Sequence, residues 1–486
     1  AGLCAASVAE PVLTSFGGGG FLLAREAGGR TVLYDFFAQT PKCRPREQDC
    51  DFFPILADFG TTQQEFHVGM GSIATPGTVK GLFRVQGDLG SMPMTRIVEP
   101  AIELARRGVS VNKLQAYIFS VVEKIYSANA PCRAVYGSGS NPGTLIGEGE
   151  TFRLPEFADT LETLAREGPD LFYKGDIGKK ILADCRDGGG ALTAQDLEDY
   201  RVILRDPLKF SCRGAQVFTN PPPSMGGLLI AFALELLKGA NIEKAGFGSA
   251  GHLSLLARVM GLTNKARIES DLCGFHEGRT DLNLLAPEFL DTYRKQIMDR
   301  PAAVRGTTQI SVIDAKGNAC ALTLSNGEGA GYMVPGTGIM MNNMLGEEDI
   351  NPHGFHRWRE DMRMSSMMAP MVLEGGDGRL TALGSGGSNR IRTAILQVLL
   401  NLLYFGMSMA EAVDSPRIHF EHDLLSVEAG FHGDAVRSFV ADFPNRKLWD
   451  EKNLFFGGVH SVTFDARDGR FEGAGDPRRG GVSLIV

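Results

Sequence analysis

Thr307 and Thr308 are the first candidates for chemistry, because a threonine hydroxyl can attack a carbonyl group when a base activates it. They follow Gly306 and precede a predicted β-hairpin, whose strands over 310–313 and 319–324 flank the string "DAKGN". The Asp, Gly and Asn of that string are typical of a tight turn. A threonine is also an ordinary β-forming residue, so the local pattern leaves a structural interpretation open.

The string "LGSGGSNRIRTAILQVLL" is a second candidate. A strand is predicted to end at Leu383, Gly386 and Gly387 allow a sharp turn, and a helix is predicted to begin near Asn389. Backbone amides and the positive end of the helix would then point to one place, which favours an anion or oxyanion pocket. Simple packing of a helix against a strand would give the same pattern.

Two predicted loops carry polar side chains that could bind a substrate. Ser365 and Ser366 are adjacent in "RMSSMMAP", before a predicted strand at Met371. The string "NNMLGEED" supplies Asn343 and Glu347, together with other acidic residues that could receive an ammonium group. Both strings are equally typical of solvated surface loops.

Several other kinds of site are disfavoured. The sequence has no HExxH motif and no G-x-S-x-G elbow, and His419 and His422 of "HFEH" should lie on opposite faces of a strand. The four glycines over 17–20 lack the Lys-Ser or Lys-Thr of a phosphate loop and precede a predicted strand over 21–24. The eight cysteines form no CxxC pair, so we expect reduced thiols and no zinc site.

Composition limits the class of protein further. The chain of 486 residues carries a net charge of -8, which argues against nucleic-acid binding and favours small molecules or peptides as ligands. The apolar runs from Gly226 and Ala394 are too short to cross a bilayer, so we expect no membrane span. The first residues resemble the middle of a helix, so any signal peptide would lie upstream. The expected location is the cytoplasm, with the periplasm or secretion as alternatives.

The remaining pattern predicts a layered α+β protein. Amphipathic helices ending at Gly are predicted in "MTRIVEPAIELARRG" and "EFADTLETLAREG". The chain is expected to be mainly helical over 249–296 and mainly strands from Thr307 onward, with helices over 390–405 and 409–414.

The ordered set of motifs resembles the γ-glutamyltranspeptidase family of N-terminal nucleophile hydrolases over nearly the whole chain. The strings that carry the resemblance are "GGGGF", "MGSIATPGTVKGL", "LTAQDLEDYRV", "TNPPPSMGG", "GTTQISVIDAKGNACALTLSN", "GTGIMMNN", "MSSMMAP", "GSGGSNRI" and "GDPRRGG". The resemblance implies a four-layer αββα fold, with two stacked antiparallel sheets between helical layers. It also implies that the chain cuts itself between Gly306 and Thr307. Residues 1–306 and 307–486 would then be the large and small segments of one intertwined domain, a heterodimer that can oligomerise further.

The same resemblance implies the roles of the catalytic residues. Thr307 would supply the nucleophilic hydroxyl and, after the cut, an α-amine that acts as the base, since its ordinary pKa is about 7.7 to 8.0. Gly386 and Gly387 match the oxyanion-hole glycines. Ser325 stands about where the family has a threonine that hydrogen-bonds the nucleophile, although a one-residue deletion nearby leaves the register open. No metal or organic cofactor is implied.

Substrate-binding roles are also implied by the resemblance. Ser365 and Ser366 match the pair that holds the α-carboxylate of a glutamyl donor, and Asn326 matches an asparagine that contacts the substrate. Glu347 falls where the family has an aspartate that binds the donor α-amine, and Met344 falls where it has Gln or Glu.

Two positions depart from the family pattern. Phe37 in "DFFAQTP" replaces an arginine that binds the donor α-carboxylate, and Gln309 replaces the histidine that commonly follows the two threonines. The expected activity is therefore γ-glutamyl transfer or glutathione hydrolysis through an acyl-Thr307 intermediate, with water or an amine as the acceptor. One alternative is an acylase of the same mechanism that takes a glutaryl or other N-acyl donor, and another is an inactive family member that acts as a binding protein.

Overall fold

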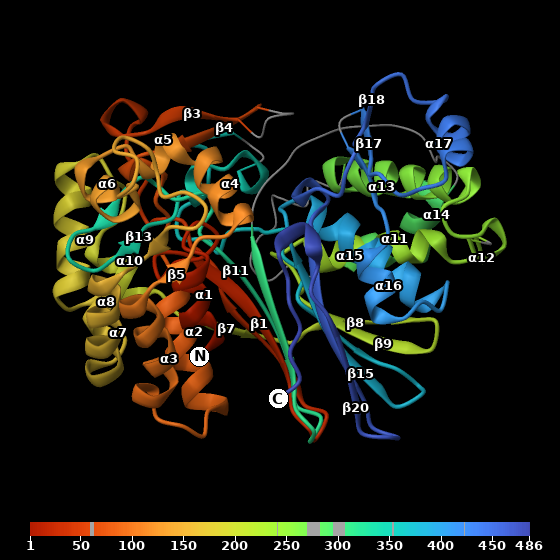
Figure 1. Cartoon of the computed structure of the whole chain (residues 1–486), viewed down its shortest axis with the longest axis horizontal. Coiled ribbons are helices and arrows are strands. Elements are labelled where there is room, and N and C mark those ends of the chain that lie inside the picture. The colour runs from red at the N-terminus through yellow and green to blue at the C-terminus, as the bar shows by residue number, and fades with distance from the viewer. Residues whose placement is uncertain (59–62, 241, 270–281, 295–306, 352–353, 422) are drawn as a thin grey trace. The chain divides into compact units, whose positions relative to one another are not determined.

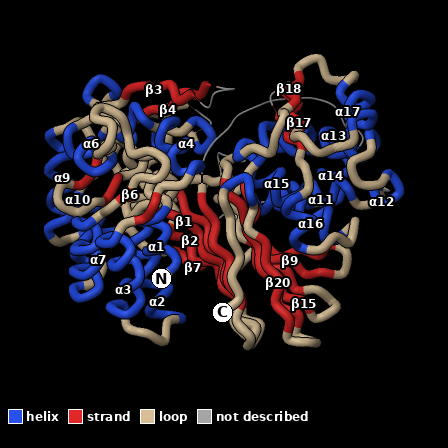
Figure 2. The backbone as a smooth tube through the Cα atoms, viewed as in Figure 1, coloured by secondary structure: helices blue, strands red, loops and turns tan. Residues whose placement is uncertain are grey.

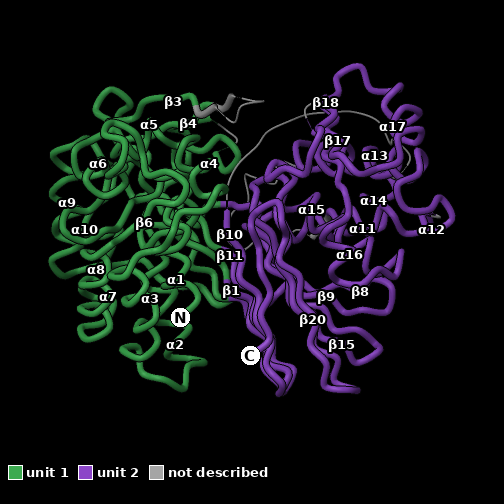
Figure 3. The backbone as a smooth tube through the Cα atoms, in the orientation of Figure 1, with its two compact units in different colours: residues 1–21, 34–204, 324–364 green, residues 22–33, 205–323, 365–486 purple. Residues whose placement is uncertain are grey.

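The structure is a computed structural model, and it describes residues 1–58, 63–240, 242–269, 282–294, 307–351, 354–421 and 423–486 (Figure 1). The chain divides into two compact units, each assembled from separate stretches of sequence (Figure 3). Unit 1 comprises residues 1–21, 34–204 and 324–364, and unit 2 comprises residues 22–33, 205–323 and 365–486. Each unit therefore contains residues from both sides of position 306.

Unit 1 consists mainly of helices. These are α1 Gly2–Ala9, α2 Thr78–Leu89, α3 Met94–Arg107, α4 Lys113–Val121, α5 Glu123–Tyr126, α6 Ala130–Tyr136, α7 Pro155–Glu167, α8 Asp170–Tyr173, α9 Asp176–Asp187 and α10 Ala194–Asp199. Three two-stranded antiparallel sheets lie among them: β3 Phe53–Asp58 with β4 Gln63–Val68, β5 Val109–Ser110 with β6 Thr151–Phe152, and β12 Met333–Val334 with β13 Ile339–Met340.

A five-stranded sheet has the order β10-β11-β1-β2-β7. Its strands are β10 Thr308–Ile313, β11 Ala319–Ser325, β1 Gly19–Arg25, β2 Thr31–Phe36 and β7 Ile203–Arg205. The turn between β10 and β11 forms as predicted, because the amide of Asp314 donates to the carbonyl of Asn318 and the amide of Gly317 donates to the carbonyl of Asp314. The hairpin thus places Thr307 immediately before its first strand.

Unit 2 contains a six-stranded sheet of order β20-β19-β15-β14-β9-β8 (red in Figure 2). All neighbouring strands in this sheet are antiparallel. Its strands are β8 Leu208–Cys212, β9 Ala215–Thr219, β14 Met371–Glu374, β15 Arg379–Gly386, β19 Gly458–Asp465 and β20 Arg470–Ala474. Strand β10 packs against β15 and β19, so the two sheets meet within this unit. The apolar helices α11 Gly226–Leu237 and α15 Arg390–Leu403 pack against the six-stranded sheet and each other.

The other elements of unit 2 lie around these helices. They are α12 Ile242–Ala245, α13 Ala250–Glu269, α14 Pro287–Arg294, α16 Met409–Asp414, α17 Gly433–Val440 and the small sheet β16 Ile418–Glu421, β17 Leu424–Val427 and β18 Arg446–Leu448. The short 3-10 helices η7 Leu454–Phe456 and η8 Pro477–Arg479 flank strands β19 and β20. Within the parts of the chain described above, no helix is both long and apolar enough to cross a membrane.

The α+β class predicted from the sequence is confirmed, and so are most of its long elements. Helices α3 and α7 end at Gly108 and Gly168, whose φ angles of 92° and 84° favour glycine. One predicted boundary was wrong. Strand β15 continues past Leu383 to Gly386, because its pairing with β19 extends as far as the pair of Gly386 with Gly458. The glycine pair therefore belongs to the strand end as well as to the turn.

Candidate active site

Thr307 is buried at the start of β10, with 4% of its surface exposed. The backbone of Gly386 lies directly against it: a Cβ atom at Gly386 would stand 1.8 Å from the carbonyl oxygen of Thr307. No side chain fits in that distance, so the contact requires glycine at the end of β15. The predicted cut falls between Gly306 and Thr307, and Gly306 lies outside the described residues.

Gly387 makes the turn from β15 into α15. Its φ of 121° is a conformation that glycine adopts readily, and a Cβ atom there would come within 3.0 Å of Cα of Gly457. The hydroxyl of Ser385 donates to the carbonyl of Gly386 over 2.8 Å and accepts from the amide of Gly458 over 3.1 Å. The predicted glycine turn is therefore present, and the neighbouring strand fixes it beside Thr307.

Gln309 fills the next inward position of β10. Its Oε1 accepts from the hydroxyl of Thr323 over 2.5 Å, and its Nε2 donates to the hydroxyl of Ser311 over 3.0 Å. The side chain rests on Gly384, where a Cβ atom would lie 2.2 Å from the same Oε1. Gln309, which the sequence identified only as a departure from the family, therefore connects β10 with β11 and β15.

Arg479 also contacts Thr307, and sequence reasoning gave it no role. Its Nη1 donates to the carbonyl of Thr307 over 3.3 Å, and its Nη2 donates to the carbonyl of Leu454 over 3.4 Å. The aliphatic part of the side chain lies on Gly458, where a Cβ atom would stand 2.4 Å from Cδ of Arg479. The string "GDPRRGG", in which two arginines are flanked by glycines, was the sequence feature that could have drawn attention to Arg479.

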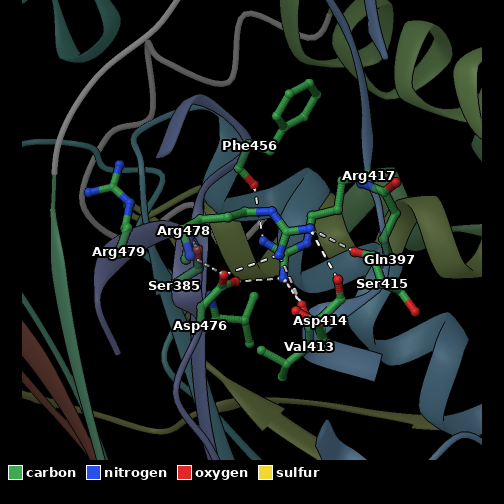
Figure 4. A network of polar contacts seen from close by, with 12 residues as sticks. Ser385, Gln397, Val413, Asp414, Ser415, Arg417, Phe456, Asp476, Arg478 and Arg479 are labelled. Atoms are coloured by element: carbon green, nitrogen blue, oxygen red, sulfur yellow. Dashed lines mark hydrogen bonds and ion pairs between the residues drawn. The ribbon is translucent and has the colours of Figure 1, made fainter. Parts of the chain in front are cut away.

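A buried ionic network fixes the segment that carries Arg479 (Figure 4). Asp476 pairs with Arg417 over 2.7 Å and with Arg478 over 3.1 Å, and Arg478 also pairs with Glu428 over 2.5 Å. Burial alone would raise the pKa of Asp476, but the nearby charges of Arg417 and Arg478 hold it below its ordinary value. The network thus keeps its charges and holds η8 in place.

Ser366 is buried in unit 2, whereas its sequence was also typical of a solvated surface loop. Its hydroxyl accepts from the amide of Met368 over 3.0 Å, and its carbonyl accepts from the hydroxyl of Ser224 over 3.0 Å. Asn220 donates to the same Ser224 hydroxyl over 2.6 Å. Ser365 beside it is partly exposed. The proline-rich loop before α11 therefore holds the backbone of Ser366.

The predicted unit 1 residues Ser325, Asn326 and Glu347 are all buried. The hydroxyl of Ser325 accepts from the amide of Gly327 over 3.1 Å. A Cβ atom at Gly327 would lie 2.2 Å from Oε1 of Glu347 and 2.1 Å from Oδ1 of Asn343. The side chains of Ser325, Asn343 and Glu347 therefore lie around one glycine. The "NNMLGEED" segment is not the solvated surface loop that its composition allowed.

Phe37 belongs to the apolar core of unit 1. Only 1% of its surface is exposed, and its ring stacks on Phe21 with the centroids 5.4 Å apart. The preceding Asp35 pairs with Arg363 over 2.7 Å, with both side chains buried. The Arg363 guanidinium also donates to the carbonyl of Arg201 over 2.7 Å. Position 37 therefore contributes an apolar ring where the resemblance led us to expect a cation.

Metal-ligand patterns receive no support from the described part of the chain. No group of three or more His, Cys, Asp or Glu residues there could hold a metal ion. His419 is buried between Thr393, 2.9 Å away, and Glu421, 3.1 Å away, while His422 lies outside the described residues. The described cysteines are thiols, and Cys273 is not among them.

Comparison with known proteins identifies a common family. The profile of the family described as Gamma-glutamyltranspeptidase matches residues 1–486. The glutathione hydrolase proenzyme of Escherichia coli K12 is 30% identical and covers 98% of this chain and 84% of its own length. The acylase ACY 1 proenzyme of Pseudomonas sp. strain V22 is also 30% identical and covers 100% of this chain and 88% of its own length. The crystal structure of cephalosporin acylase from Bacillus halodurans shares the fold, with a TM-score of 0.83 at 22% identity over 99% of this chain and 89% of that one.

Proposed function

Because the chain belongs to the gamma-glutamyltranspeptidase family of enzymes, we propose that it is an autoprocessed N-terminal threonine amidase and acyltransferase. The main support is the packing of Gly386 against the buried Thr307 carbonyl, which leaves no room for a side chain. In this proposal the chain is cut before Thr307, and residues 1–306 and 307–486 remain associated as two segments of one enzyme.

The proposed reaction forms and then breaks an ester on Thr307. The hydroxyl oxygen attacks the amide carbonyl of the donor, and its proton passes to the α-amine of the same residue. Amides at Gly386 and Gly387 stabilise the oxyanion of the tetrahedral intermediate, a contribution that is typically about 100- to 1,000-fold in rate. The intermediate collapses and expels the donor amine, which takes the proton from the α-ammonium group. Water or an acceptor amine then attacks the acyl ester and restores the threonine.

The first donor candidate is a γ-glutamyl amide such as glutathione, as in the E. coli relative. In this assignment Glu347 receives the donor α-ammonium group, Asn326 contacts the donor, and Ser365 and Ser366 hold its α-carboxylate. The burial of Glu347 supports it, because a carboxylate shielded from water attracts a cation more strongly.

The second candidate is a glutaryl or other N-acyl donor, and one observation favours it. Phe37 is packed on Phe21 and supplies no bidentate cation for an α-carboxylate. An acyl group without an amino-acid head does not need that cation. The equal identity of the chain to an acylase relative agrees with this candidate.

A matched pair of anilides tests both donors. Turnover of γ-glutamyl-p-nitroanilide and glutaryl-p-nitroanilide should differ in kcat/KM by at least about tenfold, since one buried charge contact contributes on the order of 2 kcal/mol or more. Preference for the γ-glutamyl compound supports the first candidate, and preference for the glutaryl compound supports the second. Thr307→Ala should abolish the turnover of both, and an active Thr307→Ala variant would contradict the proposed mechanism.

A further inference from the structure

Arg479 is a cation held in place beside the Thr307 backbone. Its guanidinium contacts the Thr307 carbonyl oxygen over 3.3 Å, and Cβ atoms at Gly386 and Gly387 would lie 3.4 Å from its Nη1 and 3.2 Å from its Nη2. The side chain thus follows a surface made by glycines, with Gly458 beneath its aliphatic part. Larger residues at these three positions would displace it.

The backbone of η8 aims this side chain. The carboxylate of Asp476 accepts from the amide of Arg478, and Gly480 ends the turn with a φ of 59°. Arg478 is completely buried in its pairs with Asp476 and Glu428. Figure 4 shows Arg479 pointing away from this network, so the two successive arginines have different surroundings.

We propose that Arg479 is a positioning residue for the acyl transfer: it holds the Thr307 carbonyl and thereby orients the nucleophile and base of the same residue. This inference rests on the proposed function. Once the chain is cut, Thr307 loses its covalent restraint on the amino side, and contacts to its carbonyl restrain the residue from the other side. A planar guanidinium that donates to two different carbonyls, those of Thr307 and Leu454, is suited to that task.

A second consequence concerns the charge of the base. Covalent geometry places the α-nitrogen of Thr307 within about 7 Å of the Arg479 guanidinium. A positive charge at that distance disfavours the ammonium form, so the α-amine should titrate about one pH unit lower than it would without Arg479. More of the base would then be available at neutral pH.

Among the described residues, the neighbouring charged groups His460 and Asp476 do not replace Arg479. His460 on β19 has its pKa lowered to about 4, mainly by burial, so it is neutral at neutral pH. Asp476 is already paired with Arg417 and Arg478. Strands β11 and β15 present Thr323 and Ser385, which do not titrate in this range.

The test compares R479Q and R479K with the parent and with the control R470Q, whose side chain is 80% exposed in the parent protein. For each, kcat and kcat/KM are measured against pH on the better anilide, and the α-amine of Thr307 is titrated by its rate of reductive methylation. R479Q should move the acidic limb of kcat/KM and the midpoint of methylation upward by about one pH unit, and should lower kcat at least about tenfold. R479K should keep the limb in place but lower kcat, because lysine retains the charge without the planar fork. R470Q should match the parent.

The results separate a positioning role from a structural one. Unchanged profiles in both Arg479 variants would overturn the inference, as would equal losses of kcat with unshifted limbs. If R479Q is not cut before Thr307, R479K serves as the test. A lower kcat with an unshifted acidic limb of kcat/KM supports the inference, and an unchanged kcat overturns it. A parent protein that is neither cut before Thr307 nor active would overturn the proposed function and this inference with it. A cut, active parent with unaffected Arg479 variants would overturn the inference alone.

Discussion

The surroundings of Thr307 in unit 2 and those of Phe37 in unit 1 differ in what is buried and how it is used. Around Thr307, a glycine backbone and the Arg479 guanidinium lie against one peptide carbonyl. Around Phe37, an aromatic stack lies next to the buried pair of Asp35 and Arg363. The first arrangement leaves backbone and charge facing the proposed nucleophile, whereas the second uses its side chains for packing. Under the proposed function, the first region would carry out the acyl transfer, and the second would no longer supply a cation for the donor.

Gly386→Ala, which changes the surroundings of Thr307, should cause the largest loss of activity. Its methyl group would overlap the Thr307 carbonyl oxygen, so either the strand end or Thr307 must move. We expect kcat/KM to fall at least about 100-fold, the scale of losing an oxyanion donor, together with incomplete cutting. Anilide turnover and a denaturing gel measure both.

Gly28→Ala is the matched control, because a Cβ atom at that exposed position would meet nothing within 4 Å. It should retain the activity of the parent, with a free energy of unfolding within about 0.5 kcal/mol. Full activity in Gly386→Ala would mean that close packing on Thr307 is not required.

Phe37→Arg tests the second region, the apolar packing around Phe37. Restoring the cation expected from the family would place a charge inside an apolar stack, so we expect the free energy of unfolding to fall by about 3 kcal/mol or more. Denaturant unfolding measures the loss. Phe53→Arg is the control, since Phe53 is 43% exposed and should tolerate the charge.

A Phe37→Arg variant that keeps its stability would contradict the difference drawn between the surroundings of Thr307 and those of Phe37. A variant as stable as the parent that turns over γ-glutamyl anilide at least about tenfold better than before would show that position 37 has space for a donor carboxylate. Phe37 would then determine donor choice directly.

His460→Gln should give the smallest change, and only in acid. The pKa of His460 is lowered to about 4, first by burial. The unfolded chain therefore takes up a proton before the folded chain does, so stability present above about pH 6.5 is lost as the pH falls toward 4. Because the residue is partly exposed, the loss attributable to it should be on the order of 2 kcal/mol, and His460→Gln should remove that part of the slope.

Thermal or denaturant unfolding between pH 4 and 7 measures this slope. The exposed His432 provides the control, and His432→Gln should leave the slope unchanged. A slope that His460→Gln does not alter would show that His460 takes up its proton at the same pH in the folded and unfolded chains, and it would contradict this prediction.

Local patterns in the sequence predicted the elements well where one segment determines them. "DAKGN" forms the turn between β10 and β11, and α3 and α7 end at the expected glycines. The order of motifs also identified the family, which the match over residues 1–486 confirms. The assigned roles of Thr307, Gly386 and Gly387 remain predictions.

The rest depends on contacts between distant segments. Glu347 and Ser366 lie in strings that suit a solvated loop, yet both are buried, because Gly327 and the loop around Ser224 pack against them. The proximity of Arg479 to Thr307 could not be read from either segment, since 172 positions separate the two residues. Strand pairing and the buried network around Asp476 bring them together.

The most direct test of the central claim is the intact mass of the smaller fragment, measured before and during turnover of the better anilide. The account predicts a fragment that begins with an unblocked Thr307 and that transiently gains the mass of the acyl group on that residue. An active protein in which Thr307 is still peptide-bonded to Gly306, or in which the acyl group is found on another residue, would contradict it.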